Sequence, residues 1–206
     1  MICQAIKIKQ LGLQDYDSVW QAMRLFTQQR GSKTQDEIWV VEHFPVFTLG
    51  RNGKREHILD AGDIPIIAID RGGQVTYHGP GQLIIYVLLD LKRRQLGVRQ
   101  FVTYIENAII EFLADHHVIA NNDPKAPGVY VKGKKIAALG LRISRGCSTH
   151  GLSFNIDMDL SAFKRINPCG YKNLEVTQCK DINIDQSMQQ IAKALVQGLK
   201  MKIQSV

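Results

Sequence analysis

The sequence has only four cysteines and lacks any arrangement of them that would form a disulfide framework or a structural metal site. Cys3, Cys147, Cys169 and Cys179 include no C-x-x-C pair and no zinc-type cluster with histidine. The longest apolar run, residues 83–91, is the length of a strand and too short to span a membrane. The N-terminus alternates apolar and polar residues without the apolar core of a signal peptide. We therefore expect a cytoplasmic protein with free thiols and no bound metal.

Motifs for nucleotides and nucleic acids are missing as well. The chain has no G-x-x-x-x-G-K-[ST] loop, no aromatic residues interleaved with its basic segments and no nucleic-acid-binding motif. It has no internal repeat, low-complexity tract or linker, which at 206 residues predicts a single domain over residues 1–206. The formal net charge of +7 therefore favours an acidic protein partner over nucleic acid or a membrane.

Strand and helix signals alternate along the chain. Strands are expected at residues 4–9, 38–44, 46–50, 64–70, 82–91, 127–131, 135–144 and 150–160, and helices at residues 14–29, 98–115, 161–166 and 187–202. The run at residues 82–91 is apolar on both faces, as a central strand covered on two sides would be. The pattern predicts the α/β class, in a single domain with a mixed, largely antiparallel sheet flanked by helices.

The stretch D-R-G-G-Q-V-T-Y-H-G-P-G-Q, residues 70–82, is the first candidate site. Its four glycines would let the backbone approach a ligand closely, although glycine density alone favours a tight irregular turn. Arg71, Thr76, Tyr77 and His78 shift the balance toward a binding site, because polar groups concentrated on a loop are common at sites.

Two later segments are further candidates. In residues 134–140, Lys135 precedes two alanines and a glycine, which leave room for a ligand's chain. Residues 149–156 contain a second His-Gly pair, His150-Gly151, similar to the pair formed by His78 and its following glycine. A binding-site role and a purely structural role are about equally well supported for these two pairs. The remaining histidines, His43, His57, His116 and His117, have no comparable context and are expected to be structural or on the surface.

Cys169 lies between Pro168 and Gly170, which predicts a turn rather than the middle of a helix or central strand. A turn can expose the thiol for nucleophilic chemistry, which requires the thiolate and a nearby cation such as Lys135. Cysteines are more often buried filler, and Cys147 is a competing candidate. The motifs alone therefore leave the role of Cys169 open.

Taken together, these segments resemble one family. The blocks DEIWVVEHFPVFTLG, DRGGQVTYHGPGQLIIYVLLDLKR, APGVYVKGKKIAALGLRI and RGCSTHGLSFNIDMDLSAFKRINPCGY are similar to the octanoyl-[acyl-carrier-protein]:protein N-octanoyltransferases, or lipoyl(octanoyl) transferases. The resemblance runs from about residue 10 to residue 172, and the tail beyond shows little that matches. It implies an α/β fold shared with biotin and lipoate protein ligases.

The resemblance also assigns residues and chemistry. It implies Cys169 and Lys135 as the catalytic pair and no role for Cys147. The implied acyl-binding residues are Arg71, Gly72, Gly73, Gln74, Val75, Thr76, Tyr77, His78, Ala138, Leu139, Gly140, Gly151, Leu152 and Ser153. The implied reaction transfers an octanoyl or lipoyl group, through a cysteine thioester and without a cofactor, in the first step of protein lipoylation. The donor would be octanoyl-acyl carrier protein, and the acceptors the lipoyl domains of 2-oxoacid dehydrogenases and the glycine cleavage H protein. We expect the enzyme to be a monomer.

Two rival functions remain at this stage. An ATP-dependent lipoate or biotin ligase on the same fold would not need the thiol, and the biotin ligases' G-R-G-R-x-G-R signature is absent from the chain. A non-catalytic binding module would form no covalent adduct and, if it bound nucleic acid, would show steep salt dependence.

Overall fold

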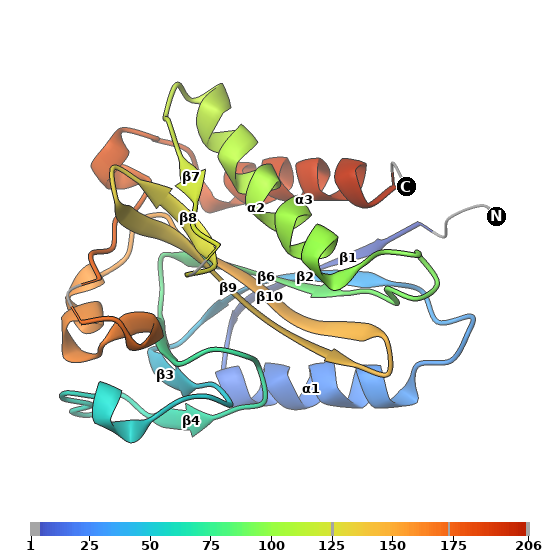
Figure 1. Cartoon of the computed structure of the whole chain (residues 1–206), viewed down its shortest axis with the longest axis horizontal. Coiled ribbons are helices and arrows are strands. Elements are labelled where there is room, and N and C mark those ends of the chain that lie inside the picture. Colours follow the sequence, from blue (N-terminus) through green and yellow to red (C-terminus); the bar gives the residue numbers. More distant parts are fainter. Residues whose placement is uncertain (1–4, 125, 173, 205–206) are drawn as a thin grey trace.

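A seven-stranded sheet forms the centre of the molecule in the computed structural model, which describes residues 5–124, 126–172 and 174–204 (Figure 1). In spatial order the strands are β1 (Lys7–Gln14), β2 (Glu37–His43), β6 (Gln82–Leu88), β10 (Cys147–Asn155), β9 (Lys134–Ser144), β8 (Gly128–Val131) and β7 (Asn121–Asn122). The pair β1–β2 is parallel and the other neighbours are antiparallel. The predicted fold class, a mixed and largely antiparallel sheet with helices, is confirmed.

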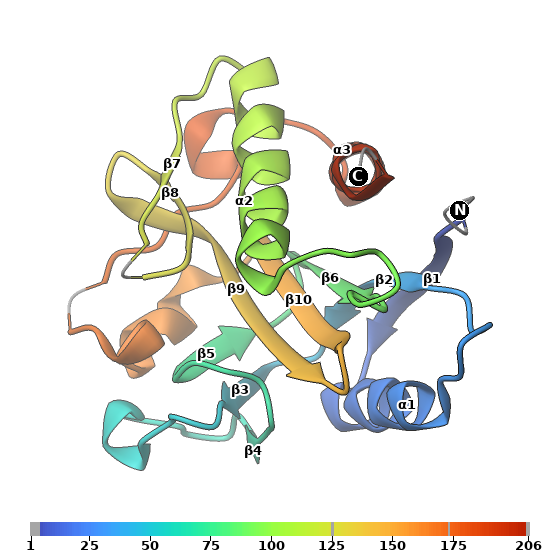
Figure 2. The ribbon, with the colours of Figure 1, turned by 45° about the vertical axis from the view of Figure 1, so that its right-hand side comes forward.

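A second, three-stranded sheet lies beside one end of the main sheet (Figure 2). It contains β4 (Ile66–Ala68), β3 (Val46–Leu49) and β5 (Val75–His78), with β3 in the middle. Short 3₁₀ turns surround it, at η1 (Arg55–His57), η2 (Leu160–Arg165) and η3 (Pro168–Gly170), and η4 (Lys180–Ile182) follows later in the chain.

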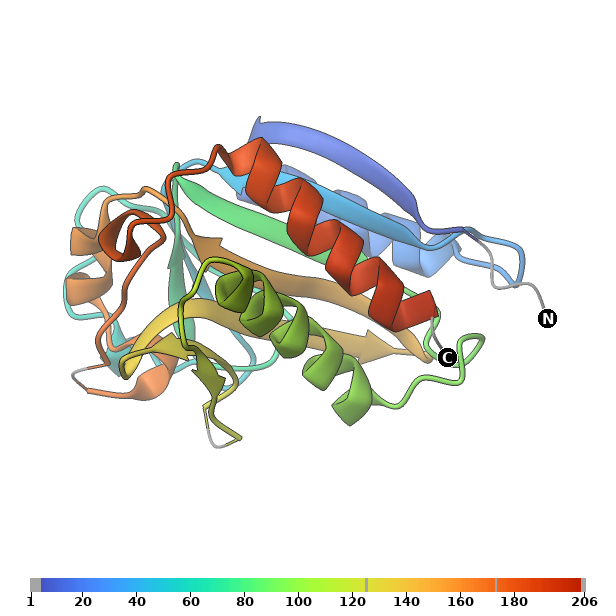
Figure 3. The ribbon, with the colours of Figure 1, turned by 90° about the horizontal axis from the view of Figure 1, so that it is seen from above.

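Helices cover both faces of the main sheet. In Figure 1, α2 (Val98–Asp115) and α3 (Met188–Gln204) lie above the sheet and α1 (Tyr16–Gln29) lies below it; Figure 3 shows α2 and α3 crossing the upper face together. Leu83 and Ile85 of β6 pack in the core of α2 and α3, while Ile84 and Tyr86 pack on the α1 side. Because side chains alternate along a strand, this central strand is buried on both faces, as its sequence predicts. Within the described residues, no helix is long and apolar enough to cross a membrane.

Several element boundaries differ from the predicted ones. The first strand runs from Lys7 to Gln14 rather than over residues 4–9, of which residue 4 lies outside the described part. The first helix starts at Tyr16, because the Asp15 side chain caps it by accepting a hydrogen bond from the Ser18 backbone N–H at 3.0 Å.

The largest difference is β5, which lies inside the stretch predicted to be a glycine-rich loop. It forms through an antiparallel ladder with β3, a long-range pairing that no local pattern reveals. The strand β10 begins at residue 147, three residues before its predicted start, and ends at residue 155 rather than 160. Strand β4 is shorter than predicted, and β7 was not predicted.

A buried carboxylate ties the connections at one edge of the sheet together. Asp36, just before β2, is 0% exposed and accepts hydrogen bonds from Arg93 Nη2 at 2.7 Å and Arg94 Nε at 2.6 Å. It also contacts Arg30, which follows α1, and accepts the Asp90 backbone N–H at 2.9 Å. One side chain thus joins the segments that follow α1 and β6, and its charge is balanced by arginines.

Asp36→Ala should lower the free energy of unfolding by about 3–5 kcal/mol, because it leaves the surrounding arginines without their carboxylate. Urea unfolding measures the change. Asp63→Ala, on an exposed loop, is the matched control and should change stability by less than about 0.5 kcal/mol. A loss below about 1 kcal/mol for Asp36→Ala would show that the cluster is not a stabilising centre.

Candidate active site

The turn predicted around Cys169 is the 3₁₀ turn η3, which holds the cysteine half-buried. The Asn167 N–H donates to the His57 carbonyl at 2.7 Å, and the Gly170 N–H donates to the Asn167 carbonyl at 2.9 Å. Cys169 itself has φ +57°, a left-handed conformation that non-glycine residues seldom adopt. Strained backbone of this kind is concentrated at functional sites.

Lys135 lies on β9 and reaches this turn. Its side chain is buried, and Nζ lies 3.2 Å from Cys169 Sγ and 3.3 Å from the Pro127 carbonyl oxygen. The Tyr130 ring lies 5.2 Å from the same nitrogen, within range of a cation–π contact. Burial lowers the pKa of the Lys135 amine, but the contacts with Cys169 and Tyr130 together outweigh it and raise that pKa. The amine is therefore held as an ammonium beside the sulfur.

Two backbone features bring Lys135 to this position. The register of β8 against β9 shifts between Val129 and Tyr130, a bulge of the kind that re-aims side chains next to active sites. Gly128 approaches the lysine so closely that a β-carbon built on it would lie 2.6 Å from the Ala137 carbonyl oxygen and 3.3 Å from Lys135 Nζ. Gly128 fits here because it has no side chain to clash and because glycine readily adopts its φ of +147°.

The tail of the chain also holds Lys135. Its backbone N–H donates to the Glu175 carbonyl at 2.9 Å, and its carbonyl accepts the Thr177 N–H at 2.9 Å. Asn155 on β10 extends the contact by donating its side-chain N–H to the Thr177 carbonyl, also at 2.9 Å. Residues 174–178, for which the sequence suggested no role, thus fix the strand that carries the lysine.

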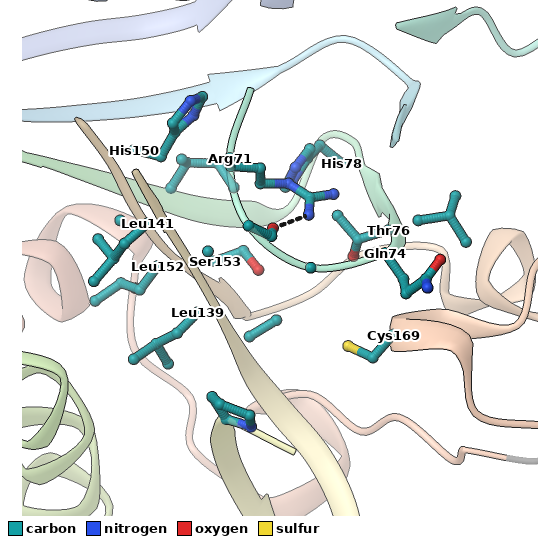
Figure 4. Close-up of a pocket in the computed structure, with 18 of the residues that line it drawn as sticks. Arg71, Gln74, Thr76, His78, Leu139, Leu141, His150, Leu152, Ser153 and Cys169 are labelled. Carbon is teal, nitrogen blue, oxygen red and sulfur yellow. Dashed lines mark hydrogen bonds between the residues drawn. The ribbon is translucent and has the colours of Figure 1, made fainter. Parts of the chain in front are cut away.

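A cavity of about 460 Å³ opens between the main sheet and the glycine-rich segment (Figure 4). Cys169 and Lys135 line it, together with most of the predicted binding residues: Arg71, Gly72, Gly73, Gln74, Val75, Thr76, His78, Ala138, Leu139, Gly140, Gly151, Leu152 and Ser153. The leucines of β9 and β10 make much of its wall apolar, and in Figure 4 the Cys169 sulfur faces this space from the side opposite His150.

Tyr77 is the one predicted binding residue that does not line the cavity. Its ring packs against Phe47 at 5.5 Å and Phe163 at 5.7 Å between centroids, in a separate apolar cluster. The reason is the strand β5: its neighbours Thr76 and His78 point to the cavity side, so Tyr77 points to the other face.

Arg71 forms part of the cavity wall as a buried cation. Its Nη1 donates to the Gly72 carbonyl at 2.8 Å, and its Nη2 donates to the Thr48 carbonyl and hydroxyl at 2.9 Å each. A β-carbon on Gly140 would lie 2.8 Å from Arg71 Cδ, so this glycine makes room for the arginine stem. Burial lowers the pKa of the guanidinium.

A cluster of buried tyrosines and histidines lies at the cavity, and of its members the sequence pointed only to His78 as a binding residue. Tyr16 and Tyr86 line the cavity, and Tyr16 stacks on His78 at 5.6 Å between ring centroids. His43, predicted to be structural or exposed, is buried and lies 2.7 Å from the Tyr86 hydroxyl through Nε2. Burial raises the pKa of both tyrosines, so their hydroxyls stay protonated.

His150 completes the cavity wall, beside Arg71 in Figure 4. Its Nε2 lies 3.0 Å from Asp70 Oδ1, and its backbone has φ +61°. The pKa of Asp70 is lowered, chiefly by this hydrogen bond, so the group is a carboxylate. Burial lowers the pKa of His150 although Asp70 opposes the shift, so the ring is neutral and donates from Nε2. Both predicted His-Gly pairs thus lie at the cavity.

The other described cysteines lie away from this cavity. Cys147 is buried at the turn of the β9–β10 hairpin, and Cys179 is fully buried in the main core. Burial raises the pKa of the Cys147 thiol, and raises that of Cys179 to about 12. Both are therefore poor thiolates at neutral pH. Cys3 lies outside the described residues.

Comparison with known proteins agrees with this geometry. A family model for the lipoyl protein ligase A/B catalytic domain matches residues 15–200. An octanoyltransferase of Shewanella halifaxensis is 55% identical over 203 residues, covering 98% of this chain and 93% of that protein. One of Shewanella baltica is 59% identical over 183 residues, covering 89% and 84%. The chain therefore belongs to the lipoyl protein ligase A/B catalytic family.

Within that family the chain is an acyltransferase, as its resemblance to the octanoyltransferases implied. The resemblance seen in the sequence ended near residue 172, and this limit was wrong, because the family match continues through the tail that anchors Lys135.

Solved structures show the same fold at low sequence identity. A lipoate-protein ligase A bound with ATP superposes with a TM-score of 0.74 at 14% identity, covering 97% of this chain and 85% of that one. A bi-partite lipoate protein ligase from Thermoplasma acidophilum has a TM-score of 0.70 at 17% identity, covering 97% and 84%. A biotin protein ligase from Aquifex aeolicus has a TM-score of 0.57 at 10% identity, covering 97% and 69%. The predicted fold, shared with lipoate and biotin protein ligases, is confirmed.

Acidification should destabilise the fold through two buried histidines, His43 and His78. Burial lowers the pKa of His43 to about 4 and that of His78 to about 3, below the 6.5 of a free side chain. The unfolded chain therefore binds more protons, so the free energy of unfolding is greatest above pH 6.5 and falls as the pH drops toward 4. Between about pH 7 and pH 5.5 we expect a loss of roughly 2 kcal/mol in urea unfolding. His43→Gln should remove about half of it, and a flat profile in the wild type would contradict the assignment of both rings as neutral.

Proposed function

We propose that this chain transfers an octanoyl group from the thioester of acyl carrier protein to a lysine of a lipoyl domain, through a thioester on Cys169. The observation that carries the proposal is the 3.2 Å contact between Lys135 Nζ and Cys169 Sγ beside a cavity with apolar walls. The octanoyltransferase names of the curated relatives support the acyl group, and one solved neighbour is described together with its E2 lipoyl domain.

In the first half-reaction the Lys135 ammonium stabilises the Cys169 thiolate, which attacks the thioester carbonyl of the donor. A carbon–sulfur bond to Cys169 forms as the bond to the phosphopantetheine sulfur breaks. The departing thiolate takes a proton from Lys135, and the donor leaves as a thiol. Because one thioester replaces another, this step is nearly balanced in free energy and needs no ATP.

In the second half-reaction the neutral Lys135 acts as the general base. The acceptor lysine, entering as an uncharged amine, attacks the Cys169 thioester, and its proton passes to Lys135. The carbon–sulfur bond breaks, an amide forms, and the thiolate–ammonium pair is restored. The conversion of a thioester to an amide is downhill and makes the transfer complete.

The cavity wall can hold the acyl group between the two half-reactions. Leu139, Leu141 and Leu152 line it, and each methylene buried against such a surface contributes about 0.8 kcal/mol. The enzyme acts as a monomer in this proposal. The net charge of +7 suits an acidic carrier protein in the cytoplasm, because complementary charge speeds encounter.

Mixing the protein with octanoyl-acyl carrier protein should add one octanoyl group to the chain, seen by intact mass spectrometry. Cys169→Ala should abolish the adduct, because the nucleophile is gone. Cys147→Ala is the matched thiol control and should load like the wild type, since this cysteine lies outside the cavity. A wild type that forms no adduct, or a Cys169→Ala variant that still octanoylates a lipoyl domain when given ATP and free octanoate, would refute the proposal.

Lys135→Ala should slow octanoyl loading by at least about tenfold, because the sulfur loses the cation that favours its thiolate. The same variant should react more slowly with iodoacetamide at neutral pH, a readout that does not depend on acyl binding. Lys134→Ala is the matched control on the same strand; its exposed amine faces Glu175 at 3.5 Å, and its loss should leave both rates unchanged. Equal alkylation rates in Lys135→Ala and the wild type would remove Lys135 from this role.

A further inference from the structure

His150 presents a buried nitrogen that no contact in the structure satisfies. The residue is 2% exposed and lines the cavity, and its Nδ1 has no hydrogen-bond partner among the described residues. Leaving a buried acceptor unpaired costs free energy, and so does the left-handed backbone of this residue, with φ +61°. Two such unfavourable features at one cavity-lining residue indicate a function in ligand binding.

Asp70 decides which ring nitrogen of His150 carries the proton. The carboxylate accepts from the Trp20 indole N–H at 3.0 Å and from His150 Nε2 at 3.0 Å. It also forms an ion pair with Arg142, whose Nε lies 3.3 Å from Oδ2. With the hydrogen of the neutral ring fixed on Nε2, Nδ1 carries a lone pair and can only accept. A group that binds there must therefore donate a hydrogen bond.

The position of His150 in the sheet matches the reach of an eight-carbon chain. A β-carbon on Gly128, which pairs with Ala138, would lie 3.3 Å from Lys135 Nζ, so the reacting sulfur lies near the level of Ala138. His150 pairs with Leu141, three residues further along β9 and therefore about 10 Å away. Seven carbon–carbon bonds of about 1.5 Å, extended as a zigzag, span about 9 Å, and a polar group on the last carbon extends the reach further. In Figure 4, Cys169 and His150 lie on opposite sides of the cavity.

We infer that His150 Nδ1 is a hydrogen-bond acceptor for the far end of the bound acyl group. The cavity then takes, besides the plain octanoyl chain, eight-carbon acyl groups that carry a hydroxyl or thiol on their last carbon. Leu139 and Leu152 pack against the methylenes of the acyl chain. His150 Nδ1, oriented by the hydrogen bond to Asp70, accepts the hydrogen bond from the group on the last carbon. The inference rests on the proposed function, because it concerns the acyl group that Cys169 receives.

The test compares pantetheine thioesters of octanoate, 8-hydroxyoctanoate and 8-fluorooctanoate as donors to the wild-type protein. Fluorine is close to hydroxyl in size but cannot donate a hydrogen bond. Loading of Cys169 is followed by intact mass spectrometry, and kcat/KM is compared. One additional neutral hydrogen bond should make the hydroxy thioester load about three- to tenfold faster than the fluoro thioester.

His150→Gly is the variant that removes the acceptor, since glycine suits a φ of +61°. In this variant the ratio of kcat/KM for the hydroxy thioester to that for the fluoro thioester should fall to about one, whatever the absolute rate of loading. A wild type that loads octanoate but shows no preference for the hydroxy thioester overturns the inference alone. A wild type that loads none of the three overturns the proposed function itself. An advantage that survives in His150→Gly assigns the hydrogen bond to another residue and also refutes the inference.

Discussion

The contact between the Lys135 ammonium and the Cys169 sulfur is the interaction on which the rest of the site depends. The two side chains come from segments that approach only through tertiary structure, a strand of the main sheet and a 3₁₀ turn beyond it. Burial by itself would lower the pKa of the lysine, and the pKa rises only because the sulfur and Tyr130 lie against it. The lysine thus keeps its positive charge in a buried position because of these two neighbours.

Much of the fold acts to hold this pair in place. The bulge in β8 changes the register beside Lys135, and the absence of a side chain at Gly128 leaves room for the lysine amine. The tail segment fixes the same strand from the other side by hydrogen bonds to the Lys135 backbone. Glycine is used here for close approach between chain segments, as it is under the stem of Arg71. The glycines around the cavity therefore serve packing within the protein as well as access for a ligand.

The sequence predicted the α/β class and most elements, because the apolar periodicity of α2 and β6 is strong and local. It also pointed to the residues that the structure brings to one cavity, since short motifs carry the family resemblance. It missed β5, which forms only by pairing with β3, and with it the orientation of Tyr77. His43 and the tail escaped notice for a similar reason: their roles come from contacts with residues distant in sequence, which no local pattern records.

The separation of lysine and cysteine between two distant segments has a consequence for the newly made protein. Until β9 and the turn at Pro168–Gly170 have docked, the Lys135 amine and the Cys169 sulfur lie apart, because only the tertiary structure brings them to 3.2 Å. A half-folded chain therefore lacks the arrangement on which the proposed loading of Cys169 depends. The site is a property of the completed tertiary structure and belongs to neither segment alone.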